Sequence, residues 1–251
     1  MRTAPALFAL ALLLSACAAS DPPPDPYALI ERARAAHGSD VLHRAVVEFD
    51  FRGKHFTVTR DGGAFRYERT YTDSTGAVRE ILDNDGIRRE IDGQGVALTD
   101  SAQSRLATPL NSVPYFALLP FNLTDPAVQA RYLGPAEIEG EPYHEVEVTF
   151  AQEDGGRDWE DRFIYWFHQD RHTMDYLAYG FHVDDGGTRF RKAVNPRRVG
   201  GVLFTDHLNY TAPELPDPTS PVHHFDSLYS AGRVELLSEI NLENVTVRPL
   251  Q

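Results

Sequence analysis

Several histidines lie close to carboxylates in this chain, and such groups can bind a metal ion. The chain has ten histidines. The neighbouring possible ligands are His223-His224 with Asp226, Asp170 with His172, and Asp206-His207. Chance adjacency is common at this histidine content, and exposed histidines in a proline-rich loop explain the first group equally well. His144-Glu145 lacks the second histidine of the H-E-x-x-H zinc motif. We therefore expect no metal and no cofactor.

One pair of adjacent carboxylates invites an acid–base interpretation. Trp159-Glu160-Asp161 places two carboxylates beside an aromatic ring. A general acid–base pair needs two carboxylates in different environments across a cleft, whereas neighbours along a strand point to opposite faces. A solvated loop explains this segment better. The sequence has no G-x-S-x-G motif and no P-loop, so we expect a protein that is not an enzyme. A hydrolase or metal-dependent enzyme is the alternative from another class.

Cys17 is the only cysteine and carries the most specific chemical signal. It follows a basic start at Arg2, a short apolar run and the exit Leu14-Ser15-Ala16. The run is too short to span a bilayer, and the whole pattern is typical of a secretory signal peptide. The exit resembles the lipobox of bacterial lipoproteins, in which the cysteine thiol is acylated before cleavage. Ordinary cleavage just beyond Cys17 is the alternative, but it leaves an exported free thiol unexplained.

The lipobox predicts where the protein resides. One acyl chain anchors a protein only marginally, whereas a lipoprotein cysteine carries two or three chains. Residue 18 is alanine rather than the aspartate that retains some lipoproteins in the inner membrane, which favours the outer membrane, facing the periplasm. The segment from Ser20 to Pro26 is proline-rich and predicts a semi-rigid spacer. The formal net charge of −13 argues against nucleic acid and anionic lipid headgroups as primary partners, but not against apolar cargo.

Aromatic residues at alternating positions are the strongest sign of a ligand site. One interpretation is an apolar cavity for a lipid tail, and the other is a filled β-sheet core. The candidate lining residues are Phe49, Phe51, Phe56, Tyr67, Phe116, Phe163, Tyr165, Phe167, Tyr179, Phe181 and Phe204.

The elements that must position these residues follow from the periodicity. Asp25-Pro26 is typical of a helix start, and we expect a helix over residues 27–37 that stops at Gly38. From Ala45 the apolar residues alternate, and Gly/Asp/Asn turns at even spacing predict an antiparallel meander of about ten to twelve strands. Residues 101–126 break the alternation and predict one or two short helices. The strand over 162–168 is apolar on both faces, so we expect one face to meet the concave interior and the other to meet a helix or loop, for which the N-terminal helix or the 101–126 segment would serve.

This layout resembles the lipoprotein-localisation-factor superfamily, with its LolA-like and LolB-like carriers. The overall arrangement is similar to an uncharacterised group of bacterial lipoproteins in that superfamily. The local matches are Ala35-Ala36-His37-Gly38, Val47-Glu48-Phe49-Asp50-Phe51 and the segment 236–245. The resemblance implies one antiparallel sheet curved into an open, incomplete β-barrel, with helices on the concave side and acyl chains bound between. The soluble carrier of that superfamily has no lipid anchor, so Cys17 argues against that particular role.

Together these features predict a mainly β protein with a few helices. We expect a signal peptide over 1–16, a lipidated cysteine and spacer over 17–26, and a half-barrel domain over 27–251. The expected function is a lipid-anchored envelope protein of carrier or sorting type that binds a lipid or acyl chain. A structural or interaction lipoprotein without a ligand is a further alternative. The expected partners are the membrane, through the N-terminal acyl chains, and an apolar ligand.

Overall fold

Two groups of antiparallel strands make up most of the molecule. The computed structural model describes residues 22–153, 160–182 and 186–250, which contain fourteen strands. The first group has bounds β1 Arg44–Phe51, β2 Lys54–Asp61, β3 Ala64–Asp73, β4 Gly76–Asp83, β5 Gly86–Ile91 and β6 Gln94–Val96. The second has bounds β7 Val128–Ile138, β8 Glu141–Phe150, β9 Arg162–His168, β10 Met174–Phe181, β11 Gly187–Val199, β12 Val202–Thr211 and β13 Glu235–Ile240. The last strand, β14 Glu243–Pro249, pairs with β1 and belongs to the first group.

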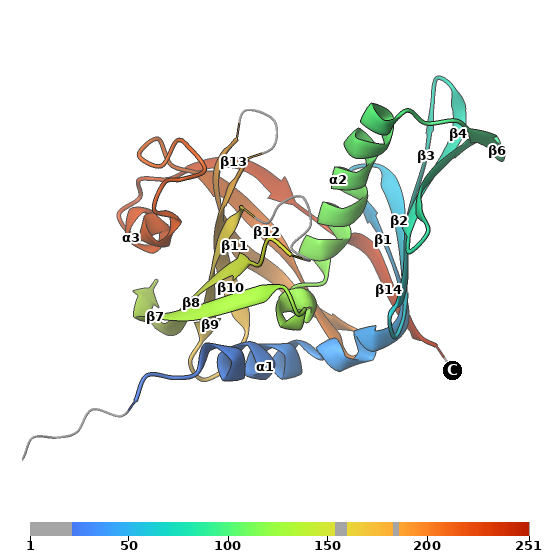
Figure 1. Ribbon diagram of the computed structural model, residues 1–251. Helices are drawn as coiled ribbons and strands as arrows, with labels where there is room; N and C mark the ends of the chain where they lie inside the picture. Colours follow the sequence, from blue (N-terminus) through green and yellow to red (C-terminus); the bar gives the residue numbers. More distant parts are fainter. Residues whose placement is uncertain (1–21, 154–159, 183–185, 251) are drawn as a thin grey trace, which may run out of the picture.

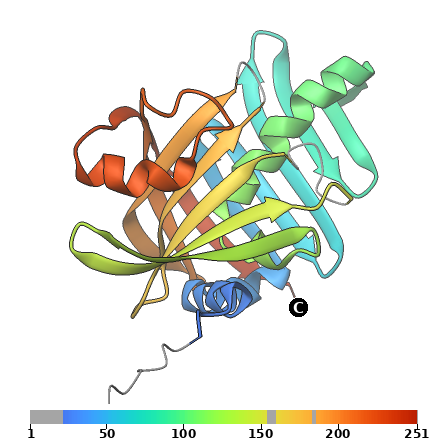
Figure 2. The same ribbon diagram turned by 60° about the vertical axis from the view of Figure 1, so that its left-hand side comes forward.

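The strands form two seven-stranded sheets rather than the single sheet expected from the sequence. Sheet A has the order β14-β1-β2-β3-β4-β5-β6 and sheet B the order β13-β12-β11-β10-β9-β8-β7. The chain passes from sheet A to sheet B through α2 and returns through the short link between β13 and β14. The sheets do not close into a barrel, so the predicted mainly β, open half-barrel is confirmed (Figures 1 and 2). The strand number is fourteen in the described residues, above the ten to twelve expected; β6 has only three residues, all exposed, and shows no alternation.

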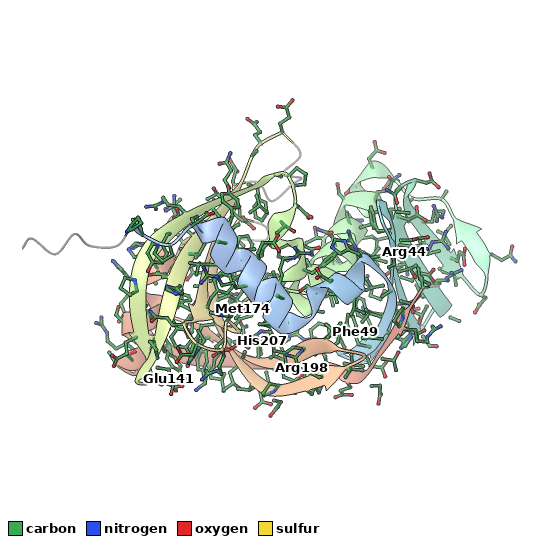
Figure 3. All side chains as sticks on the ribbon, turned by 90° about the horizontal axis from the view of Figure 1, so that it is seen from below. Arg44, Phe49, Glu141, Met174, Arg198 and His207 are labelled. Atoms are coloured by element: carbon green, nitrogen blue, oxygen red, sulfur yellow. The ribbon has the colours of Figure 1, made fainter. Side chains whose placement is uncertain are left out.

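The N-terminal helix α1, Pro26–His37, confirms the helix predicted from Asp25-Pro26. The Asp25 carboxylate accepts a hydrogen bond from the Tyr27 N–H at 3.1 Å, and Gly38 ends the helix in the left-handed conformation (φ 71°). A Cβ on Gly38 would lie 2.2 Å from the Gly201 carbonyl oxygen, so only glycine fits there. At this end the His37 Nε2 accepts the Met174 N–H at 3.0 Å, which joins α1 to the start of β10. Met174 is labelled beside α1 in Figure 3.

Helix α2, Asp100–Ala117, lies between the two sheets. It is one continuous helix of 18 residues, although it contains Pro109 and Pro114. Three short 3-10 segments also occur: η1 Ser39–His43, η2 Phe121–Thr124 and η3 Val222–His224. No helix in the described ranges has the length and apolar character needed to cross a membrane.

Strand β9 is buried on both faces, as its sequence predicts, but the covering elements differ from those expected. Its concave face packs with α1 and with residues that follow α2, such as Leu119 and Leu123. Its other face carries Ile164 and Trp166 and packs under the segment 212–230, which contains α3, Phe225–Ser230. The N-terminal helix and the 101–126 segment therefore share one face. The segment 212–230 covers the other face of the sheet. On the neighbouring strand β10 this cover is so close that a Cβ on Gly180 would lie 2.2 Å from the Pro218 carbonyl oxygen.

Candidate functional site

A cavity of about 520 Å³ opens between the C-terminal half of α2 and sheet B. Its volume lies within the roughly 300–1,000 Å³ typical of small-molecule sites. The cavity uses the end of β10, at Tyr179 and Phe181, whereas α1 contacts the start of that strand at Met174. The fold therefore closes one end of the concave face with a helix and leaves a hollow at the other.

One wall of the cavity is aromatic and is built from three neighbouring strands and α2. Phe116 of α2 packs on Tyr179 at 5.1 Å between ring centroids and on Phe163 at 6.3 Å. Phe163 stacks on Tyr179 at 5.4 Å, because these two residues are register partners on β9 and β10. Phe150 and Phe181 extend this surface. Adjacent strands thus produce a continuous apolar face.

A polar wall continues from the aromatic one across β11 and β12 of the same sheet, and its composition follows from strand register. Arg191 on β11 lies directly opposite Asn209 on β12, and His207 lies opposite Ala193. Arg189 lies opposite Tyr179 of β10. Alternation places residues two apart on one face, so Arg189 and Arg191 share the cavity side, as do His207 and Asn209. Phe190, between the two arginines, is buried on the other face.

Arg191 is held by aromatic rings. Its guanidinium lies 4.1 Å from the centroid of the Phe116 ring and 5.1 Å from that of Tyr179. Its Nη2 donates a hydrogen bond to the Tyr179 hydroxyl at 2.6 Å. Within the described residues it forms no ion pair, so the cavity wall holds a cation that is oriented but not neutralised.

Three buried polar atoms of this wall have no hydrogen-bond partner within the described part of the chain: Arg191 Nε, His207 Nε2 and Asn209 Oδ1. His207 and Asn209 are 6% and 8% exposed. Burial and the nearby Arg191 charge lower the pKa of His207 to about 3, so this imidazole is neutral at physiological pH. The Asn209 amide nitrogen donates to Ser238 Oγ at 3.2 Å and leaves its oxygen free.

The eleven aromatic residues predicted to line a cavity occupy three places in the fold. Five lie on the cavity wall: Phe51, Phe116, Phe163, Tyr179 and Phe181. Four are buried in the core against sheet A: Phe49, Phe56, Tyr67 and Phe204. Tyr165 and Phe167 are buried beneath α1. The aromatic set thus contains both a filled core and a cavity wall.

The other predicted groups separate in the structure. No cluster of three or more possible metal ligands occurs in the ranges that the structure describes. The Asp206 carboxylate accepts hydrogen bonds from Arg197, Asn195 and the Leu242 N–H, whereas His207 faces the cavity. Trp159 lies outside the described residues. Glu160 is exposed, but the solvated-loop interpretation was wrong for Asp161, which is 8% exposed, lines the cavity and pairs with His182 Nδ1 at 3.1 Å.

The sequence interpretation missed the polar wall. Arg189 and Arg191 alternate with the apolar Phe190, and this pattern reads as a strand with its charged face toward solvent. What was missing is that Phe190 faces the segment 212–230, which makes the arginine face the inner one. The inward orientation of these arginines can be predicted only when it is known that the segment 212–230 covers Phe190.

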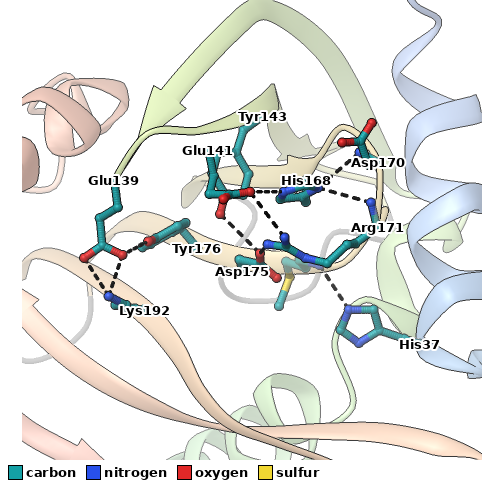
Figure 4. Close-up of polar contacts among 11 residues, drawn as sticks. His37, Glu139, Glu141, Tyr143, His168, Asp170, Arg171, Asp175, Tyr176 and Lys192 are labelled. Carbon is teal, nitrogen blue, oxygen red and sulfur yellow. Dashed lines mark hydrogen bonds and ion pairs between the residues drawn. The ribbon is translucent and has the colours of Figure 1, made fainter.

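A separate polar network surrounds His168 at the turn between β9 and β10 (Figure 4). The His168 Nδ1 accepts the N–H groups of Asp170 and Arg171 at 3.1 Å each, so its Nε2 carries the proton and donates it to Glu141 at 2.8 Å. Arg171 also bonds Asp175 at 2.9 Å. These groups hydrogen-bond to one another, and the network fixes the turn between β9 and β10.

Comparison with known proteins identifies the family of this chain. No curated protein gives a significant match. Among solved structures, a LolA superfamily protein from Nitrosomonas europaea is 12% identical with a TM-score of 0.46, over 87% of this chain and 94% of that one. A DUF1329 family protein from Desulfovibrio piger is 12% identical with a TM-score of 0.41, over 89% and 93%. A putative outer membrane lipoprotein-sorting protein domain from Vibrio parahaemolyticus is 8% identical with a TM-score of 0.34, over 74% and 86%.

One family model covers almost the whole chain. It matches residues 7–241, which include α1, α2 and every strand that contributes to the cavity wall. The chain therefore belongs to the family of unknown function DUF6503.

Proposed function

We propose that this protein is a lipid-anchored carrier of the bacterial envelope that binds an apolar chain in the cavity beside α2. The observation that carries the proposal is the hollow of about 520 Å³ with one aromatic wall. A mixed wall of this kind buries an apolar ligand and orients it by a few polar groups. The aromatic rings of Phe116, Phe163 and Tyr179 already pack against one another and offer a formed apolar surface to a chain.

The anchor is the second part of the proposal. Cys17 and residues 1–21 lie outside the described residues, so acylation rests on the sequence pattern. A Cys17→Ser variant is expected to lose its acyl chains and to leave the membrane fraction, as judged by fractionation and intact mass. A variant that stays in the membrane with its acyl chains intact contradicts the anchor without touching the cavity.

The cavity is tested by native mass spectrometry of the Cys17→Ser protein purified from cells. We expect apolar adducts to co-purify, and added long-chain lipid to be taken up. A Ser112→Trp substitution places an indole in the cavity wall and is expected to abolish uptake. Gln103→Trp, on an exposed position of the same helix, is the matched control and is expected to bind normally.

Three results would redirect the proposal. Absence of any adduct and of any uptake by the folded protein favours a structural lipoprotein. Equal uptake by the Ser112→Trp variant places the binding elsewhere. Release of a shortened product from an ester-linked probe assigns the cavity to a hydrolase instead.

A further inference from the structure

The polar wall of the cavity contains more positive charge than an apolar ligand needs. The described residues that line the whole cavity include three arginines, Arg52, Arg189 and Arg191, and one carboxylate, Asp161. The whole chain has a formal net charge of −13, so this wall is a local reversal of sign. In a partly enclosed site such charges act on a ligand more strongly than surface charges do.

Arg191 is the central residue of this wall. Its cavity side is fixed by the Phe116 and Tyr179 rings and by the Tyr179 hydroxyl, so its geometry is set before any ligand arrives. Its buried Nε has no hydrogen-bond partner within the described part of the chain. A guanidinium with a free N–H in a pocket is suited to a carboxylate or a phosphate, which accept charge-assisted hydrogen bonds.

Two neighbours supply further unused polar atoms. Asn209 is the register partner of Arg191, and His207 is two residues away on the same face. The His207 Nε2 and the Asn209 Oδ1 are buried and unpaired among the described residues. An unsatisfied buried polar group is destabilising, and three of the eleven such atoms in the described residues lie together on this one wall, which indicates a missing polar partner.

We propose that Arg191, His207 and Asn209 form a subsite for an oxyanion headgroup, and that the ligand is an anionic single-chain amphiphile with a carboxylate or phosphate. This inference rests on the proposed function and specifies its ligand. The headgroup accepts from Arg191 Nε, while the chain lies on Phe116, Phe163 and Tyr179. The His207 Nε2 donates in its Nε2-protonated tautomer, and the Asn209 oxygen accepts from a protonated headgroup oxygen or from a water that the headgroup retains.

The test compares probes that share a chain and differ in headgroup. The full chain carrying Cys17→Ser is titrated with hexadecanoate, hexadecyl phosphate and hexadecanol, and with acetate and inorganic phosphate as chain-free anions. We expect at least one anionic amphiphile to bind roughly tenfold or more tightly than hexadecanol, since hydrogen bonds to charged groups are the strong ones. Which of the two anions binds more tightly identifies the headgroup.

Variants then locate the effect. Arg191→Met is expected to reduce the ratio of anion affinity to hexadecanol affinity to about one, whatever its effect on the hexadecanol affinity itself. Arg131→Gln, which removes an exposed arginine paired with Glu147, is the control and is expected to keep the preference. Thermal unfolding without ligand verifies that each variant is folded, and the wild-type ratio of the anionic amphiphiles to hexadecanol tests the subsite even if Arg191→Met does not fold.

Failure of the subsite is distinct from failure of the carrier. Equal affinity for hexadecanol and both anions overturns the subsite but keeps the carrier. Preservation of the preference in a folded Arg191→Met variant overturns it as well. Binding of acetate or inorganic phosphate as tight as that of the amphiphiles overturns the amphiphile assignment, and no binding of any chain-bearing probe overturns the proposed function itself.

Discussion

The guanidinium of Arg191 lies 4.1 Å from the centroid of the Phe116 ring. This contact joins the middle of sheet B to the last turns of α2, two parts of the chain separated by four strands in sequence. A second link lies beside it, where the hydroxyls of Tyr115 and Tyr165 are 3.4 Å apart. The helix that bounds the cavity is thus held both by Arg191 of the cavity wall and by Tyr165 of the core beneath α1.

The coupling between Arg191 and Phe116 can be measured by a double-mutant cycle. We expect Phe116→Leu and Arg191→Met each to lower the free energy of unfolding. The loss in the double variant should be about 1 kcal/mol smaller than the sum of the two single losses, because the cation–π contact can be lost only once. Urea unfolding of the four proteins provides the comparison. Strict additivity would show that the two residues contribute independently.

Two glycines with the same backbone angle separate strain from steric overlap. Gly38 and Gly53 both have φ of 71°, but a Cβ on Gly38 meets the Gly201 carbonyl oxygen at 2.2 Å, whereas one on Gly53 meets nothing within 4 Å. We expect Gly53→Ala to cost about 1–2 kcal/mol from the left-handed conformation alone. Gly38→Ala is expected to cost clearly more, as measured by chemical denaturation. Equal losses would mean that the contact between α1 and the turn before β12 relaxes freely.

Local signals in the sequence predicted the helix ends and most strands. Asp25-Pro26 and Gly38 act within α1 itself, so their effect is readable without knowledge of the tertiary fold. The length of α2 could not be predicted from such local signals, which indicated one or two short helices. Pro109 and Pro114 lie five residues apart inside one helix, and packing of Leu110 and Pro114 in the interior stabilises it against the local cost.

The division into two sheets and the polar cavity wall depend on contacts between distant residues. Whether β13 pairs with β12 and β14 with β1 is decided by long-range register, which alternation in either strand does not specify. In the same way, Arg189 and Arg191 face inward because the segment 212–230 covers Phe190. The negative net charge of the chain argued against anionic lipid headgroups as partners. It is a sum over the whole chain, however, and does not describe the local charge of a cavity.

Acid should destabilise the protein through His37. Burial lowers the pKa of His37 to about 4, below the ordinary value of 6.5. Between these pH values the unfolded chain binds a proton that the folded chain does not, so stability falls as pH decreases from 6.5 to 4, by about 3 kcal/mol for this group. His37→Gln keeps an acceptor for the Met174 N–H and is expected to flatten this part of the pH profile, apart from the similar contribution of His207. His224→Gln, at an exposed position, should leave the profile unchanged; an equal effect of both substitutions would contradict the assignment to His37.

Glu145 should act in the opposite direction. Burial, reinforced by Asp226 and Glu147, raises its pKa from 4.5 to about 7. The folded protein therefore binds a proton that the unfolded chain releases, and this contribution to stability is lost as pH rises from 4.5 through 7. Glu145→Gln removes the buried charge and is expected to stabilise the protein by about 1–2 kcal/mol above pH 7, with little effect below pH 4.5. Glu141→Gln is the matched comparison on the same strand, because Glu141 accepts hydrogen bonds from His168 Nε2 at 2.8 Å and from Arg171 Nη1 at 3.3 Å, so its loss should not stabilise. Thermal unfolding at pH 4.5 and pH 8 measures both variants, and a Glu145→Gln gain that is the same at the two pH values would show that its carboxylate charge is not the cause.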